Sequence, residues 1–157
     1  MLHEWLCRPH VSRWWQPSPS RAEVEEDFVP MTSDGNDTTR GHIAMLESRP
    51  IGFIQCYVVA GSGGGWWEEE ADPGARGIDQ FLASAEDLGK GLGSAMVRAF
   101  VDRLFLDPRV TKVQTDPSPD NGRAIRSYEK AGFVARGEVE TPDGPALLML
   151  RERPEQP

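Results

Sequence analysis

The chain has 157 residues and a net charge of −8, from 17 basic and 25 acidic side chains. This length fits a single domain with one core, and the shortage of basic residues argues against a nucleic-acid partner, whose phosphates need a basic footprint. No apolar run approaches the roughly 20 residues that span a bilayer, and no signal peptide is predicted at the start. The two cysteines, Cys7 and Cys56, are too few for a disulfide framework. A cytosolic protein is therefore expected.

The first forty residues predict helices followed by a loop. Apolar side chains recur there at helical spacing, and a proline interrupts them. The apolar positions are Leu2, Leu6, Trp14 and Trp15, and the interruption is Pro9. A second helix is expected from Ser20 through Pro30, because Ser20 and Glu23 have the spacing of a capping box. The polar segment 31–40 predicts a loop.

The rest of the chain predicts strands that alternate with helices. The expected strands are 42–46, 51–60, 76–83, 110–115, 133–139 and 146–151, and the expected helices are 91–106 and 121–131. Turns at 47–50 and 141–145 join the first and the last pair of strands. This alternation predicts an α/β fold in which helices cover a mixed sheet, with residues 1–157 forming one domain.

A glycine-rich turn precedes the helix expected at 91–106. Its residues are Gly89, Lys90, Gly91, Leu92, Gly93 and Ser94. Glycines let backbone N–H groups approach a ligand closely, and a helix N-terminus adds unpaired donors with a partial positive charge. Such a turn suits a pyrophosphate, although its order matches neither the P-loop nor the dinucleotide-binding motif. A plain turn between strand and helix is the alternative.

The helix expected at 121–131 places three notable residues on one face. Asn121, Ala124 and Tyr128 have i, i+3, i+7 spacing, and Gly132 ends the helix. The small alanine between two polar residues leaves room for the arm of a ligand. The alternative is an amphipathic helix with Tyr128 packed in the core.

The glycine turn and the later pattern N-x-x-A-x-x-x-Y-x-x-x-G-F resemble the acetyl-CoA site of the GNAT acetyltransferases. The resemblance implies that backbone amides from Gly89 to Ser94 hold the CoA pyrophosphate. It implies further that Asn121, beside Ala124, contacts the CoA arm and that Tyr128 protonates the departing thiolate. The implied fold is a mixed, mainly antiparallel central sheet flanked by helices, without the family's usual first strand.

Four further strings narrow the resemblance. They are Trp66-Trp67-Glu68-Glu69-Glu70, Arg76-Gly77-Ile78-Asp79-Gln80, Gln114-Thr115-Asp116-Pro117-Ser118-Pro119 and Thr141-Pro142-Asp143-Gly144-Pro145. They are similar to the aminoglycoside 6′-N-acetyltransferases of the type Ib group, and the match covers nearly the whole chain. Two departures stand out: the acidic Asp87 beside the expected phosphate site, and the larger ring of Phe81 beside the expected acceptor cleft, which is expected to alter which aminoglycosides fit.

The resemblance gives the acceptor side a chemistry that the net charge supports. An aminoglycoside carries several ammonium groups, each of which needs a carboxylate or carbonyl partner. By resemblance, Asp79 is the base that takes a proton from the acceptor ammonium, and Asp116 binds a ring ammonium. The expected substrate-binding residues are Trp66, Trp67, Glu70, Asp79, Gln80 and Asp116. For the tryptophans the alternative is core packing, and for the glutamates it is a solvated face.

The expected reaction is direct transfer of an acetyl group from acetyl-CoA to the 6′-amine of an aminoglycoside, which confers antibiotic resistance. No metal is expected, because His3, His10 and His42 are scattered along the chain. A monomer without nucleic-acid or membrane partners is expected. Two alternatives are a GNAT enzyme for another amine, such as a polyamine or a protein N-terminus, and a CoA-binding module without turnover.

Overall fold

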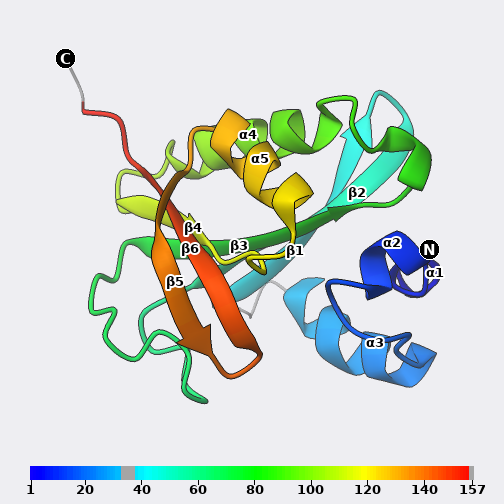
Figure 1. Cartoon of the computed structure of the whole chain (residues 1–157), viewed down its shortest axis with the longest axis horizontal. Helices are drawn as coiled ribbons and strands as arrows, with labels where there is room; N and C mark the ends of the chain where they lie inside the picture. Colours follow the sequence, from blue (N-terminus) through cyan, green and yellow to red (C-terminus); the bar gives the residue numbers. More distant parts are fainter. Residues whose placement is uncertain (33–37, 156–157) are drawn as a thin grey trace.

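The computed structural model describes residues 1–32 and 38–155, and it has a six-stranded sheet with helices on both faces (Figure 1). The strands are β1 (Thr39–Leu46), β2 (Arg49–Val58), β3 (Ala75–Leu82), β4 (Lys112–Thr115), β5 (Val134–Thr141) and β6 (Gly144–Glu152). Their order across the sheet is β1-β2-β3-β4-β6-β5. Only the β3–β4 pair is parallel, so the expected mixed, mainly antiparallel sheet is confirmed.

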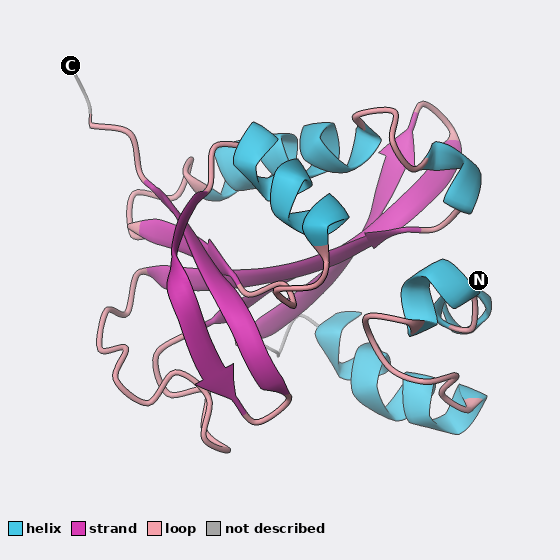
Figure 2. Ribbon diagram, viewed as in Figure 1, coloured by secondary structure: helices cyan, strands magenta, loops and turns pink. Residues whose placement is uncertain are grey.

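The N-terminal helices cover one face of the sheet (Figure 2). They are α1 (Leu2–Leu6), α2 (Pro9–Ser12), α3 (Arg21–Phe28) and the short 3₁₀ helix η1 (Val29–Thr32). Pro9 divides the first predicted helix by starting α2, where its missing N–H costs nothing. The capping box is present: Glu23 donates its backbone N–H to Ser20, and the backbone N–H of Ser20 donates to the Glu23 carboxylate.

The helices α4 (Leu92–Leu104) and α5 (Gly122–Lys130) cover the opposite face. Side chains alternate along β3, so Ile78 packs against this pair of helices while Phe81 packs against the N-terminal ones. Apolar residues on both faces of the sheet bury the strands, and a short 3₁₀ helix, η2 (Ala85–Asp87), leads from β3 toward α4.

The structure changes several predicted boundaries. Both hairpins are tighter than expected: only two residues separate β1 from β2, and β5 from β6. Left-handed backbone at Glu47 and Gly144, with φ of 55° and 106°, closes these turns. The loop predicted at 31–40 is partly wrong, since η1 extends to Thr32 and β1 begins at Thr39; its middle, 33–37, lies outside the described residues.

β3 is paired unequally on its two sides, and this opens the sheet. It pairs with β2 from Arg76 to Leu82, but with β4 only from Ala75 to Gly77. Beyond Gly77, therefore, β3 and β4 diverge. The N-termini of α4 and α5 lie beside this opening (Figure 1). In the part of the chain that the structure describes, no helix has the length and apolar character needed to cross a membrane.

Candidate active site

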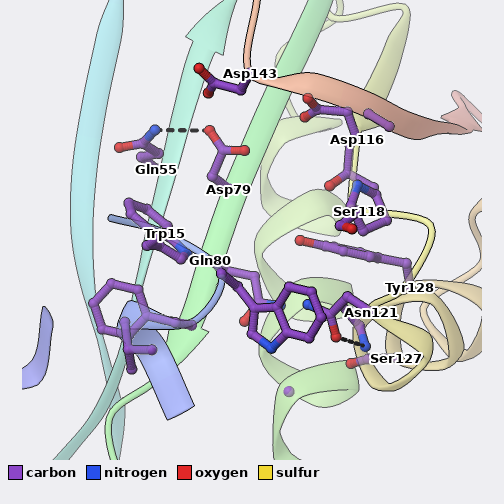
Figure 3. Close-up of a pocket in the computed structure, with 18 of the residues that line it drawn as sticks. Trp15, Gln55, Asp79, Gln80, Asp116, Ser118, Asn121, Ser127, Tyr128 and Asp143 are labelled. Carbon is purple, nitrogen blue, oxygen red and sulfur yellow. Dashed lines mark hydrogen bonds between the residues drawn. The ribbon is translucent and has the colours of Figure 1, made fainter. Parts of the chain in front are cut away.

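A cleft of about 1580 Å³ occupies the opening between β3 and β4. One part is lined by the glycine turn and the first turns of α5, and another by acidic side chains from the sheet and its hairpins. Figure 3 shows the acidic part, with side chains from β2, β3 and the β5–β6 turn meeting around one space. The divergence of the two central strands therefore brings together the two halves that the sequence predicted.

Three carboxylates extend into the acidic part of this cleft (Figure 3). Asp79 comes from β3, Asp116 directly follows β4, and Asp143 lies in the β5–β6 turn. Burial raises the pKa of Asp79, the Gln55 side chain opposes this rise, and the Asp143 carboxylate adds to it. Burial, with the charges of Asp79 and Asp143, raises the pKa of Asp116 to about 8. Cations that enter this space would relieve the mutual repulsion.

Tyr128 extends from α5 toward the middle of the cleft, and it is also packed in the core. Its side chain is only 4% exposed and its ring packs edge-on against Phe133, with centroids 5.5 Å apart. Burial raises the pKa of the Tyr128 hydroxyl to about 12, although the side chains of Thr115 and Gln80 oppose this rise. Tyr128 consequently holds its proton at neutral pH and is available as a proton donor.

The glycine turn presents backbone rather than side chains to the cleft. Gly89 and Gly91 adopt left-handed φ angles of 73° and 79°, and Gly91 is the N-cap of α4. The cleft is lined by Gly89, Gly91 and Gly93, together with Leu88. Lys90, Leu92 and Ser94 were predicted to contribute backbone amides, and their side chains do not line the cleft: Leu92 packs against the core and Ser94 contacts Ser127.

The acidic residue before the glycine turn has a partner of its own. Both guanidinium nitrogens of Arg49 donate to the Asp87 carboxylate, at 2.8 and 3.2 Å. Asp87 is buried, and the hydrogen bond with Arg49 lowers its pKa. The Arg49 guanidinium therefore compensates the charge of Asp87, which does not line the cleft.

Asn121 has a structural task at the start of α5. Its Oδ1 accepts the backbone N–H of Ala124 at 3.2 Å, which caps the helix. Both residues line the cleft, so the predicted contact with a ligand arm is compatible with their placement. Capping fixes the first turn of α5 beside the glycine turn.

The two tryptophans before β3 are half-buried, so neither is a core residue. Their rings pack on each other with centroids 5.9 Å apart, and both line the cleft. Trp67 also donates its ring N–H to the hydroxyl of Tyr57 at 3.2 Å. The prediction of Glu70 as a substrate-binding residue does not fit: its carboxylate pairs with Lys112 at 2.6 Å, accepts the backbone N–H of Asp72, and lies outside the cleft lining.

Several residues of the site were not predicted. Gln55 and Tyr57 lie on β2, opposite Asp79 and Gly77 of β3, and both line the cleft. Strand alternation combined with the correct register would have identified them. Asp143 was assigned only to a turn, because no local pattern shows that the turn reaches the ends of β3 and β4. Phe81 borders the cleft but is buried against Trp15, at 5.0 Å between centroids.

Comparisons with known proteins agree with this geometry. A family model described as an acetyltransferase (GNAT) domain matches residues 1–141. The chain is 56% identical over 156 residues to an aminoglycoside N(6′)-acetyltransferase type 1 of Klebsiella pneumoniae, which covers 98% of this chain and 77% of that protein. A kanamycin resistance protein of Rhizobium radiobacter is 68% identical over 90 residues, covering 57% of this chain and 83% of that protein.

Solved structures give the same result. A crystal structure of AAC(6′)-Ib with coenzyme A matches with a TM-score of 0.92 and 57% identity, covering 98% of this chain and 88% of that one. A structure of AAC(6′)-Ib with coenzyme A and kanamycin gives the same TM-score of 0.92, the same 57% identity and the same coverages of 98% and 88%. The chain therefore belongs to the GNAT acetyltransferase family, among the aminoglycoside N(6′)-acetyltransferases.

Proposed function

We propose that this protein transfers the acetyl group of acetyl-CoA to the 6′-amine of aminoglycosides and so confers resistance to them. The observation that carries this proposal is the single cleft that joins a backbone-lined glycine turn to a group of three carboxylates. The first half suits a diphosphate, and the second suits a polycation. The similar AAC(6′)-Ib structures contain coenzyme A, and one also contains kanamycin.

The donor half would hold acetyl-CoA through backbone amides. The glycine turn leads into α4, a helix of 13 residues whose first N–H groups have no partners within the helix. Those N–H groups and the helix dipole favour the diphosphate. The backbone of β3 from Ile78 to Leu82, which does not pair with β4, can lie along the CoA arm. An N–H group of this segment would polarise the thioester carbonyl.

In the reaction, Asp79 would accept a proton from the acceptor ammonium. The N–H bond breaks, the electron pair stays on nitrogen, and the neutral amine attacks the thioester carbonyl. When the carbon–sulfur bond breaks, Tyr128 would donate its proton to the departing thiolate. The nitrogen loses a second proton as the amide forms, and this proton would restore the Tyr128 hydroxyl. The raised pKa of Asp79 makes its carboxylate a stronger base, and the raised pKa of Tyr128 keeps its proton in place before the reaction.

The acceptor half would recognise the other ammonium groups. Asp116 and Asp143 lie beside Asp79, where they could bind amines on neighbouring rings. Trp66 and Trp67 offer flat apolar faces for sugar rings at the cleft. Gln80 would act near the reacting atoms through its contact with Tyr128. Glu70 is left out, because its carboxylate is paired with Lys112.

Two alternatives are separated from this proposal by one assay of thiol release from acetyl-CoA. The proposal expects rapid release with kanamycin or tobramycin, and little with spermine or a peptide. Release with spermine or a peptide alone would favour an enzyme for another amine. Binding of CoA without release would favour a module without turnover. We also expect the protein to be cytosolic and monomeric. Gel filtration would test the monomeric state through the apparent mass.

A further inference from the structure

Gln55 lies directly beside the proposed base. It belongs to β2 and stands opposite Asp79 of β3 in the antiparallel register, so the two side chains extend from the same face of the sheet. Its Nε2 donates to Asp79 Oδ2 at 2.8 Å, and Gln55 lines the same cleft (Figure 3). Figure 3 shows the other carboxylate oxygen of Asp79 directed away from Gln55, toward Asp116.

From this contact, and resting on the proposed function, we infer that Gln55 is a positioning residue that binds Oδ2 of Asp79 so that the substrate's proton passes to Oδ1. In that step an N–H bond of the acceptor ammonium breaks and an O–H bond forms at Oδ1. The electron pair remains on the nitrogen that attacks the thioester. With one carboxylate oxygen fixed, the other keeps a constant direction toward the acceptor.

The contact with Asp79 determines how the amide group of Gln55 is oriented. An ionised carboxylate only accepts hydrogen bonds, so the amide must present its N–H₂ group. This leaves Oε1 buried without a hydrogen-bond partner among the described residues. A buried carbonyl oxygen without a partner is unfavourable. The orientation of the amide thus favours the contact with Asp79 over the pairing of its own carbonyl oxygen.

The charged surroundings of Asp79 make the donor important. Several titratable groups interact electrostatically with Asp79 or with one another. They are Asp116, Asp143 of the β5–β6 turn, Tyr57 of β2 and Tyr128 of α5. The charge of Asp79 also contributes to raising the pKa of Cys56 on β2, and the charge of Arg76 on β3 opposes this rise. Asp143 favours the protonated form of Asp79, and the Gln55 donor favours the ionised form. Removing that donor should therefore shift the titration of Asp79 to higher pH.

The test compares Gln55→Met, which removes the donor at similar length, with Gln55→Glu, which puts a second acid in its place. The acidic limb of kcat/KM for kanamycin should move to higher pH in both variants, and further in Gln55→Glu. A shift of one pH unit means roughly tenfold less activity below the limb. The KM for acetyl-CoA should not change. A second readout follows the Asp79 carboxyl carbon by NMR, assigned with Asp79→Asn, and should show the same shift without any turnover.

The two readouts separate the possible failures. Loss of activity by one constant factor at every pH, with an unchanged Asp79 titration, would overturn the inference and leave Gln55 a packing residue. If the unmodified protein does not acetylate kanamycin, the proposed function fails, but the NMR titration still decides the role of Gln55: an unshifted Asp79 overturns it.

Discussion

Asp79 and Tyr128 have opposite proton-transfer tasks, and burial serves both of them. Removing a carboxylate from water disfavours its charge, so the ionised form becomes a stronger base. Removing a phenol from water disfavours phenolate, so the proton remains available. The direction of both pKa shifts fits these tasks. The same physical effect thus prepares one side chain to accept a proton and the other to donate one.

Replacing Asp79 by Asn should remove the base while keeping the shape of the site. We expect kcat to fall on the order of 10²- to 10⁴-fold, the range of general base catalysis. Binding of CoA, measured by calorimetry, should stay unchanged. Asp102→Asn is a matched control, since Asp102 pairs with Arg151 and lies outside the cleft lining. An unchanged kcat in Asp79→Asn would refute the assignment of the base.

Replacing Tyr128 by Phe should remove only the hydroxyl. Because the ring also packs against Phe133, the fold should be retained. We expect kcat to fall by about 10²-fold or more, as for loss of a general acid. The Kd for CoA should change much less. If only the affinity for CoA changed, Tyr128 would be a packing residue and another group would protonate the thiolate.

Proton release should accompany binding of the aminoglycoside. Burial, with the charges of Asp79 and Asp143, raises the pKa of Asp116 to about 8, which favours its protonated form in the free protein. A bound ammonium favours the ionised form, which lowers this pKa and releases a proton. Calorimetry of kanamycin binding at about pH 7, in buffers of different ionisation enthalpy, measures that release. Asp116→Asn should reduce it, and equal release in both proteins would contradict this account.

At the scale of elements, one ion pair links the turn between β3 and α4 to the start of the neighbouring strand β2. Arg49 starts β2, whereas Asp87 ends η2, just before the glycine turn. The bidentate contact thus ties the cofactor half of the cleft to the β1–β2 hairpin. The backbone amides of the turn bind a diphosphate well only when they are held in place.

Arg49→Met should therefore loosen the glycine turn. The KM for acetyl-CoA is expected to rise several-fold, while the KM for kanamycin stays the same, since only one half of the cleft is affected. Arg136→Met removes an exposed ion pair with Glu152 and serves as a matched control. Equal changes in both KM values, or none, would show that the ion pair contributes at most to stability.

The elements show how far the sequence could be interpreted. Helical spacing predicted α4 and α5 within a few residues, because their apolar faces pack on one sheet. Asp79 and Tyr128 were identified through motifs. Gln55 and Asp143 were not, since their closeness to Asp79 depends on strand register and on the path of a hairpin. The pairing of Glu70 with Lys112 could not be predicted, because a triplet of acidic residues does not show which of them meets a lysine of a distant strand.

At the scale of the whole molecule, the net charge of −8 and the acidic cleft act in the same direction. A polycation is attracted before it reaches the site, and dissolved ions weaken this attraction. The KM for kanamycin should rise several-fold between ionic strengths of roughly 0.01 M and 0.15 M. The KM for acetyl-CoA, itself an anion, should not rise in parallel. A parallel rise would point to a general effect of salt on the fold.

The most direct test of the central claim is to identify the product by NMR after incubation with kanamycin and acetyl-CoA. The similarity to aminoglycoside N(6′)-acetyltransferases, together with the placement of Asp79, Asp116 and Asp143 around one cleft, predicts a single product, acetylated on the 6′-nitrogen, and none with Asp79→Asn. Acetylation at another amine, or no acetylated kanamycin at all, would contradict the account.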